Sequence, residues 1–361
     1  MSTYPRKAKP PKEVTLRARV VLENELAYYF HLSVAKFKAG VNKALEYVKN
    51  GITNSTQLYK IAYGVIGNKR YTDGAVLLVQ DIVKSVKALG MNLSDVKLGD
   101  WWIIQARGSP RPEDKGNRNI RLLSTNELQV NVPWKGWLRF KVAFGERYIS
   151  LVSELVKKAL SRKLSYTAKI VFRNGKVYLH VSVPIELYLK HFSKGRAKGK
   201  LVAGFDLNSD RINMVIVDRQ GIIRDTKTEW FPEVTSHGFL SNKAHSIRLQ
   251  TLAKLLNYAY YHGVSTILFE DLDRIKRSRY TGNRTANRKI TRFPKRKLLQ
   301  YSIVMAMKYG FKVYLVNPAY TSKIGEKLGK ELGLDKHTAS AYVLALKYLG
   351  VAEIPLSTSS V

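Results

Sequence analysis

Three acidic residues stand in sequence surroundings that suit metal-dependent hydrolysis. Asp206 lies inside the apolar run 202–208, Glu270 ends the apolar part of 266–272, and Asp335 stands where a helix would begin. A carboxylate inside an apolar strand is costly unless another group pairs with it. Carboxylate oxygens favour Mg²⁺ or Mn²⁺, and two such ions about 3.5–4 Å apart can activate water and stabilise the leaving oxygen of a phosphodiester. We therefore expect these three acids to hold Mg²⁺ or Mn²⁺ in a nuclease site.

His337 lies two residues after Asp335 and is a candidate for proton transfer near the scissile phosphate. Each of these residues also has a structural alternative. Asp206 could be a bulge or turn residue paired with a lysine, and Glu270 could simply end its strand. Asp335 could be only a helix N-cap, a position that favours aspartate, and His337 could be a surface or capping residue. The spacing of the acids does not decide between these alternatives.

The elements expected around these residues follow the order of the RNase H-like fold. That order is three strands, helix, strand, helix, strand and helix, and it can bring a strand centre, a neighbouring strand end and a helix start together. Apolar periodicity predicts strands at 201–208, 211–218, 221–227, 265–272 and 312–317, and helices at 242–262, 297–309 and 335–349.

The N-terminal half has a different pattern. Residues 13–22 alternate like a strand, 25–49 and 56–89 have helical spacing, and a second helix is expected near 147–161. Two alternating runs within 166–184 are joined by Asn174-Gly175, which predicts a hairpin. We expect an α+β multidomain chain with these parts: a flexible basic arm (1–12), a β-rich domain (13–190) with an inserted helical segment (about 25–100), a linker (191–200), an RNase H-like domain (201–350) and a tail (351–361).

The charge of the chain points to a polyanionic partner. The 361 residues include 62 Lys and Arg against 27 Asp and Glu, a net charge of +35. Residues 201–250 are neutral, so acids are concentrated beside Asp206. The absence of cysteine excludes disulfides, thiol catalysis and Cys-ligated zinc. No apolar run is long enough to span a membrane and the N-terminus lacks a secretory signal, so we expect a cytoplasmic protein with no membrane partner.

Three motifs resemble those of a known family. They are Gly-Phe-Asp-Leu-Asn at 204–208, Phe-Glu-Asp-Leu at 269–272 and Val-Asn-Pro-Ala-Tyr-Thr-Ser at 316–322. They are similar to the RuvC-type motifs of TnpB proteins, the OrfB-type transposon-encoded RNA-guided nucleases related to compact type V CRISPR effectors. The Pro-x-Tyr-Thr-Ser run is the most specific. The resemblance covers 201–350 well, whereas 13–190 are similar only in layout.

The resemblance implies an RNA-guided DNA endonuclease whose catalytic acids match Asp206, Glu270 and Asp335. It also implies a wedge-like β-barrel with an inserted helical recognition domain, a guide RNA from the transposon end and a double-stranded DNA target. One departure is large, because TnpB proteins carry a four-Cys zinc ribbon after the Tyr-Thr-Ser run. Here only 323–334 separate Ser322 from Asp335, so the ribbon is missing and no zinc is expected.

A basic segment follows Glu270 closely, and we expect it to guide nucleic acid to the site, although a solvated loop is the alternative. Phosphate contacts of this kind set affinity rather than sequence preference. The strand residues Arg17 and Arg19 suit an RNA backbone, and the aromatic residues of the N-terminal half are either core or stacking residues. The basic segment comprises Arg274, Lys276, Arg277, Arg279, Arg284, Arg288, Lys289, Arg292, Lys295, Arg296 and Lys297, and the aromatic residues are Tyr28, Tyr29, Trp101, Trp102, Trp134 and Trp137.

Three other functions stay open. The first is an RNA-guided or sequence-tolerant DNA-binding protein with weak or no cleavage, which the missing ribbon favours. The second is a DDE-type transposase, whose acid order of Asp, Asp, Glu differs from the Asp, Glu, Asp found here. The third is a basic RNA-binding protein of ribosomal type, which leaves the neutral, acid-bearing segment 201–250 unexplained. The sequence indicates no oligomeric state.

Overall fold

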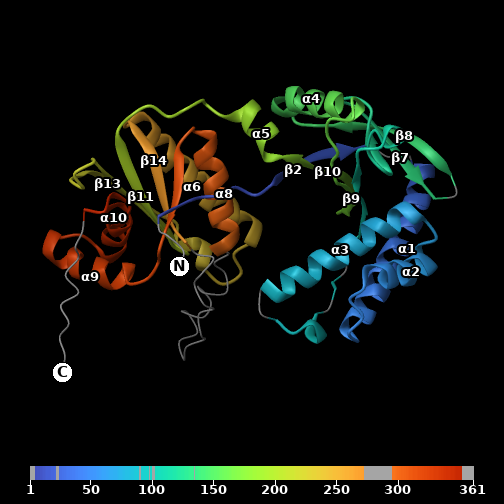
Figure 1. Cartoon of the computed structure of the whole chain (residues 1–361), viewed down its shortest axis with the longest axis horizontal. Helices are drawn as coiled ribbons and strands as arrows, with labels where there is room; N and C mark the ends of the chain where they lie inside the picture. Colours follow the sequence, from blue (N-terminus) through green and yellow to red (C-terminus); the bar gives the residue numbers. More distant parts are fainter. Residues whose placement is uncertain are drawn as a thin grey trace. The chain divides into compact units, whose positions relative to one another are not determined.

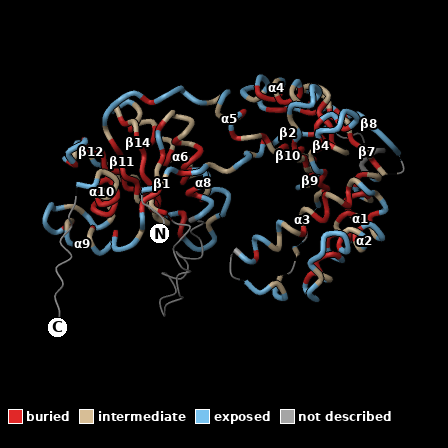
Figure 2. Tube along the Cα trace, viewed as in Figure 1, coloured by how far each residue is buried: buried red, intermediate tan, exposed pale blue. Residues whose placement is uncertain are grey.

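The chain forms two compact units (Figure 1), each with a buried core of its own (Figure 2). Lys12–His191 form one, here called the inserted unit. Met1–Pro11 and Phe192–Val361 form the other, here called the split unit because the inserted unit interrupts it in sequence. No described helix is long and apolar enough to cross a membrane. The computed structural model describes residues 5–21, 24–88, 91–96, 98–99, 102–133, 135–271 and 295–351.

The inserted unit is built on a seven-stranded antiparallel sheet in the order β3-β9-β10-β2-β8-β7-β6, which forms a nearly closed barrel. Its hairpin β9–β10 turns at Asn174 and Gly175, whose φ angles of 51° and 67° are those that such a turn demands. The strands are β2 (Glu13–Val20), β3 (Trp102–Ala106), β6 (Ile120–Leu122), β7 (Glu127–Val132), β8 (Gly136–Ala143), β9 (Ala168–Arg173) and β10 (Lys176–Pro184), with a separate pair β4 (Gly108–Ser109) and β5 (Gly116–Asn117).

Helices of the inserted unit lie mainly between β2 and β3, within the range expected for a helical insertion. Asn54 caps α2, accepting hydrogen bonds from the backbone N–H groups of Thr56 and Gln57. The helices are α1 (Asn24–Lys49), α2 (Ser55–Ile66), α3 (Lys69–Ala88), α4 (Ile149–Leu160) and α5 (Ile185–Phe192).

The split unit contains a six-stranded sheet in the order β1-β15-β14-β11-β12-β13. Strands β11, β12 and β13 are antiparallel neighbours, whereas β14 and β15 run parallel to β11. This is the strand arrangement expected for an RNase H-like domain. Its elements are β1 (Arg6–Lys7), β11 (Leu201–Leu207), β12 (Arg211–Val217), β13 (Ile223–Trp230), α6 (Ser241–Tyr261), β14 (Val264–Glu270), α8 (Lys295–Lys308), β15 (Lys312–Val316), α9 (Thr321–Leu332) and α10 (Lys336–Leu349).

The two faces of this sheet are covered by different helices. Phe205 and Phe269 belong to a core that also includes apolar residues of α6 and α8. Residues at the alternate positions of the same strands, such as Val202 and Leu268, face the other side of the sheet and pack against α10. Side chains alternate between faces along a strand, so the position of a residue in β11 or β14 decides which helix it meets.

The start of the chain differs from what the sequence predicts. The arm at 1–12 is expected to be flexible, yet Arg6 and Lys7 pair with β15 and Ala8 is buried in the core. The pairing of β1 covers an edge of β15 that would otherwise be unpaired. The two units divide between His191 and Phe192, within the linker expected at 191–200, and Ala197 of that linker packs into the core of the split unit, where its N–H donates to the carbonyl of Gly310.

The short segment after the Tyr-Thr-Ser run is also more structured than expected. Residues 321–332 form α9, for which the sequence pattern predicts no element. Gly325 and Gly329 let α9 approach its neighbours closely, because a Cβ on Gly325 would lie 2.9 Å from the backbone nitrogen of Ser340 in α10. A helix packed on α10 therefore occupies the place in sequence where a zinc ribbon is expected in TnpB proteins.

Candidate active site

Asp206 and Glu270 occupy neighbouring positions at the carboxyl ends of two parallel strands. Phe205 of β11 pairs in register with Phe269 of β14, and both rings face the α6/α8 core. The next residue of each strand must therefore face the other side, where α10 packs. The Asp206 side chain is 16% exposed, and Glu270 is also partly exposed. Two carboxylates thus share one edge and one face of the sheet.

Gly204 explains why α10 can lie so close to Asp206. It faces the same side of β11, two residues before the aspartate. A Cβ at Gly204 would lie 2.0 Å from the carbonyl oxygen of Ala341 in α10. Backbone atoms cannot move aside as a flexible side chain can, so only glycine fits. The glycine of the Gly-x-Asp motif is therefore a packing requirement that places the helix on the strand.

Asp335 is the N-cap of α10. Its Oδ1 accepts from the backbone N–H groups of His337 at 3.0 Å and Thr338 at 3.2 Å, and its Oδ2 accepts from the Thr338 hydroxyl. Desolvation raises its pKa, but the bonds from Thr338 and His337 outweigh that effect and lower the pKa overall. The carboxylate is therefore held ionised at a helix N-terminus, where the helix dipole also favours negative charge.

His337 joins the helix start to β11. Its Nδ1 lies 2.9 Å from Oδ2 of Asp206 and 3.2 Å from Nδ2 of Asn208, whose amide also donates to Asp206 at 2.9 Å. A neutral imidazole that donates from Nδ1 to the carboxylate leaves Nε2 as a proton acceptor. Asp206 and His337 thus form a carboxylate–imidazole pair with Asn208 as a second donor.

A hydrogen-bonded chain behind this pair fixes the start of α10. Asn213 of β12 pairs in register with Asp206 of β11. The Asn213 amide donates to the hydroxyls of Thr228, at 2.7 Å, and Thr338, at 3.0 Å. Since Thr338 in turn donates to Asp335, the chain links β12 and β13 to the N-cap. These hydrogen bonds tie the start of α10 to two strands of the sheet.

Lys347 holds the loop that contains the Pro-x-Tyr-Thr-Ser run. Its ammonium donates to the carbonyls of Asn317 and Ala319, at 3.2 and 2.6 Å, and to the hydroxyl of Thr321, at 2.9 Å. Desolvation lowers the pKa of Lys347, and the negative charge of Glu270 partly opposes this. The lysine is therefore close enough to Glu270 to feel its charge while it fixes the loop between β15 and α9.

The predicted site residues are brought together only in part. Asp206, Asp335 and His337 are linked by hydrogen bonds, and Glu270 is the strand neighbour of Asp206. Among residues 5–271 and 295–351, leaving out the few undescribed positions, no three acidic or histidine side chains are close enough to hold a metal ion. The hard oxygen donors of Asp206 and Glu270 suit Mg²⁺ or Mn²⁺, but the oxygens of Asp335 are engaged in capping. Metal binding by all three acids stays a prediction.

Sequence reasoning missed several residues of the site. Asn208 is part of the first motif, so its position two residues after Asp206 was a usable signal. Thr338 follows the N-cap by three residues, the usual distance of a capped group. Asn213 and Lys347 gave no local signal, because β12 and the end of α10 meet the site only through tertiary packing.

The predicted nucleic-acid contacts are described only in part. Arg274 to Arg292, and the side chain of Lys295, lie outside the described residues, as do Trp101 and Trp134. Arg17 and Arg19 are exposed on β2, and the Arg17 guanidinium lies 5.0 Å from the Tyr178 ring centroid. Trp102 and Trp137 are each 36% exposed, and Tyr28 is 67% exposed. These aromatic rings are accessible at the surface, which stacking requires.

Solved structures with a related arrangement are distant. A cryo-EM structure of a Cas12f1–sgRNA–target DNA complex aligns with 92% of this chain and 84% of its own at 11% identity, with a TM-score of 0.48. A structure of T. thermophilus RuvC in complex with a Holliday junction substrate aligns with 41% of this chain and 91% of its own at 16% identity, with a TM-score of 0.28. At these scores we draw no inference from either structure.

Sequence relatives are much closer. The uncharacterized protein SSO2105 of Saccharolobus solfataricus is 36% identical over 305 residues, covering 82% of each chain. An uncharacterized protein of Aeropyrum pernix is 32% identical over 307 residues, covering 80% of this chain and 81% of its own. The family model described as the SSO2105 N-terminal domain matches residues 13–193. The chain therefore belongs to the SSO2105 family.

Proposed function

We propose that the chain is a divalent-metal-dependent endonuclease that cleaves DNA under the direction of an RNA guide. The observation that carries the nuclease proposal is the placement of Asp206 and Glu270. They lie at the carboxyl ends of adjacent parallel strands, on the face where α10 begins with Asp335. Ligands of open α/β sheets commonly bind at the carboxyl ends of strands.

Asp206 and Glu270 would be the residues that hold Mg²⁺ or Mn²⁺, and Asp335 would join them if it released its capping bonds. The bound metal would supply positive charge that activates water and stabilises the leaving oxygen. The chain's own groups have separate tasks. Asn208 and His337 orient the Asp206 carboxylate through its Oδ2. The Nε2 atom of His337 is the candidate acceptor for a proton from water.

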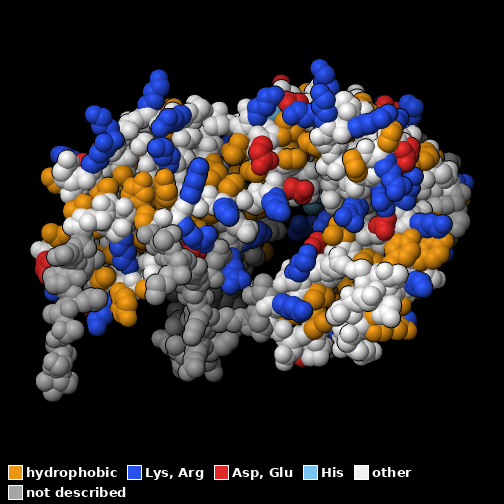
Figure 3. All heavy atoms as spheres, in the orientation of Figure 1, with side chains coloured by type: hydrophobic (Ala, Val, Ile, Leu, Met, Phe, Trp, Pro, Cys, Tyr) orange, Lys and Arg blue, Asp and Glu red, His pale blue; other side chains and the backbone are white. Residues whose placement is uncertain are grey.

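RNA guidance is supported by sequence and charge. The three motifs at 204–208, 269–272 and 316–322 resemble those of TnpB proteins. Figure 3 shows Lys and Arg side chains spread over both units, in keeping with the net charge of +35. A surface of this kind binds phosphates of any sequence, so target choice would come from base pairing with a guide. The proposed partners are a transposon-end RNA and double-stranded DNA.

The test uses the full chain purified with the RNA that accompanies it. That RNA is sequenced, and a labelled duplex matching its variable end is incubated with Mg²⁺, with Mn²⁺ or with EDTA. We expect discrete cuts that require the metal and that are lost in Asp206→Ala and in Glu270→Gln. Glu233→Ala is the matched control, because Glu233 is an exposed acid in the same unit. Cutting by Asp206→Ala at the wild-type rate would refute the assignment.

A second function is favoured by one specific observation. Both oxygens of Asp335 accept hydrogen bonds at the start of α10, and the described residues contain no three-ligand group. The alternative is an RNA-guided or sequence-tolerant DNA-binding protein with weak or no cleavage. In that case the same duplex would be bound equally well in EDTA and in Mg²⁺, without products. A random mixture of cellular RNA in the purified sample would favour sequence-tolerant binding.

A further inference from the structure

A polar pocket of about 440 Å³ lies in the inserted unit, between the start of α3 and strands β6, β7 and β8. Its volume falls within the range of small-molecule sites, about 300–1,000 Å³. The lining contains amide groups, cations and one indole, and it lies wholly outside the unit that holds the candidate active site. It is lined by Asn68, Lys69, Arg70, Glu113, Asn119, Arg121, Asn131 and Trp137.

Asn119 contributes an acceptor that no described residue satisfies. The residue is fully buried, and its Oδ1 has no hydrogen-bond partner within the described part of the chain. The orientation of its amide is fixed by Asn68, whose Oδ1 already accepts from the backbone N–H groups of Arg70 and Tyr71. The group that faces this oxygen must be a donor, so Nδ2 of Asn119 lies there, at 3.4 Å. The Oδ1 atom of Asn119 can therefore accept a hydrogen bond from an N–H or O–H group of a ligand.

An unsatisfied buried acceptor destabilises the fold, and the backbone of Asn119 is held by hydrogen bonds through both its N–H and its carbonyl. The N–H of Asn119 donates to Oδ1 of Asn117 at 3.1 Å. Its carbonyl accepts from the N–H of Asn131 at 2.8 Å. Buried unpaired groups are uncommon in native proteins. A ligand that donates to Asn119 would account for this one.

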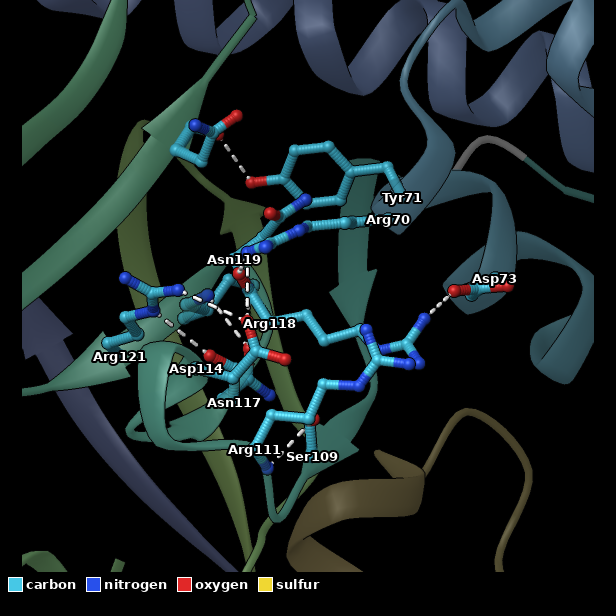
Figure 4. Close-up of polar contacts among 12 residues, drawn as sticks. Arg70, Tyr71, Asp73, Ser109, Arg111, Asp114, Asn117, Arg118, Asn119 and Arg121 are labelled. Atoms are coloured by element: carbon cyan, nitrogen blue, oxygen red, sulfur yellow. Dashed lines mark hydrogen bonds and ion pairs between the residues drawn. The ribbon is translucent and has the colours of Figure 1, made fainter. Parts of the chain in front are cut away.

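Two of the cations that line the pocket form ion pairs with one buried carboxylate. Figure 4 shows Arg70 and Arg121 both reaching the buried carboxylate of Asp114, with N–O distances of 2.9 and 3.3 Å. The Arg121 guanidinium also stacks on Trp137, 3.7 Å from the ring centroid. Together with Lys69 and Glu113, these groups leave one positive charge in excess. The pocket thus offers a planar stacking surface, an acceptor and a modest attraction for phosphate.

We infer that this pocket binds one unpaired nucleotide of a nucleic-acid strand and recognises the exocyclic amino group of its base through Asn119. Cytosine and adenine carry such an amino group, whereas uracil and hypoxanthine carry an oxygen at the equivalent position. Unpaired bases stack on aromatic rings and on guanidinium planes, which the Arg121–Trp137 pair provides. Lys69 would contact the adjoining phosphate. The inference rests on the proposed function only in taking nucleic acid as the ligand.

The test compares ten-nucleotide single strands that differ only in the amino group. The full chain, freed of copurifying RNA, is titrated with fluorescent oligocytidine and oligouridine, and with oligoadenosine and oligoinosine, at one fixed salt concentration. Deoxyribose versions of the first pair separate a preference for RNA from one for DNA. We expect about tenfold tighter binding of the amino-bearing strand in at least one pair, which corresponds to about 1.4 kcal/mol. Equal affinities within both pairs would overturn the inference.

Asn119→Leu tests the residue itself. Leucine removes the unsatisfied oxygen and one weak hydrogen bond, so the thermal stability should be kept or raised, while the amino-group preference should fall to about one. Asn92→Leu is the matched control, an exposed asparagine of the same unit whose side chain caps nothing. Preference that persists in folded Asn119→Leu would refute the role of Asn119.

Two further variants keep the test decisive. Trp137→Leu changes a partly exposed residue, so it should fold even if Asn119→Leu does not, and it should lower both affinity and preference. A Trp137→Leu protein with unchanged affinity and preference would count against the pocket. Asp206→Ala separates this inference from the nuclease proposal. It should abolish cutting and leave the amino-group preference intact, and loss of the preference in Asp206→Ala would contradict a site confined to the inserted unit.

Discussion

Asp335 allows its two candidate roles to be separated by one pair of substitutions. Asparagine caps helices about as well as aspartate, whereas alanine loses about 0.5–2 kcal/mol at an N-cap. Asp335→Ala also strips the Thr338 hydroxyl of its acceptor, at a cost of roughly 1 kcal/mol. Asp335→Asn keeps the backbone cap through its amide oxygen, and its amide nitrogen can donate to the Thr338 hydroxyl where the carboxylate accepts from it, so the main loss is the interaction of the charge with the helix dipole, about 0.3–1 kcal/mol. One kcal/mol shifts the melting temperature of a domain of this size by about 2–4 °C.

We therefore expect Asp335→Ala to melt about 3–12 °C below wild type, and Asp335→Asn about 1–4 °C below. Amide exchange of α10 peptides, measured alongside thermal unfolding, assigns the transition to the split unit. If Asp335 also binds metal, both variants should lose Mg²⁺-dependent cutting, because an amide is a poorer ligand for a hard cation than a carboxylate. Equal instability of the two variants would refute the capping geometry. Full cutting by Asp335→Asn would refute the ligand role and leave a site of two acids.

Three more predictions follow from single contacts. Gly204→Ala should destabilise the split unit by more than about 2 kcal/mol in a denaturation assay, because its Cβ would meet the backbone of α10. The control is Gly64→Ala on α2, where a Cβ would meet no other atom, and it should be neutral or stabilise by up to about 1 kcal/mol. Lys347→Met should speed amide exchange in the loop between β15 and α9, whereas Lys323→Met, at an exposed position, should not. Hydrogen bonds from Lys190, Lys158 and His191 lower the pKa of Glu154 from 4.5 to about 2. Ionised Glu154 therefore stabilises the inserted unit above pH 4.5, and this stabilisation is lost as the pH falls towards 2. Glu154→Gln should therefore flatten urea-denaturation stability across that window, and an unchanged slope would contradict the ion-pair geometry.

The order of most elements in the split unit could be predicted because each of these elements carries a local signal. The apolar runs ending at Asn208 and Glu270 give buried strands, and Asp335 marks a helix start. The segment after Ser322 gave no such signal, because glycines at 325 and 329 lower helix propensity. Those glycines face α10, where close packing compensates for the loss. Tertiary contact, which a single sequence does not display, decides this helix.

The candidate site could be predicted at the level of residue type but not of bonding. The strand positions of Asp206 and Glu270 follow from their apolar neighbours. For Asp335 both the catalytic and the capping interpretation predict a helix start, so the sequence could not separate them. Asn213 lies on β12 and Lys347 lies near the end of α10, and both reach the site only through tertiary packing. The pocket around Asn119 was not predicted at all, because its lining comes from five separate segments.

The pairing of Arg6 and Lys7 with β15 has a consequence for how this protein can be made and dissected. The sheet of the split unit joins residues 6–7 to β15, so it cannot be completed on the ribosome until Lys312–Val316 have been synthesised. The inserted unit is continuous and can fold earlier. A fragment starting at residue 192 would expose β15 as a free edge and would lack Arg6, which binds Asp271 at 2.8 Å. Supplying residues 5–8 to such a fragment, through a linker or as a separate peptide, would restore the cover on the β15 edge, and a covered edge is protected from edge-to-edge association.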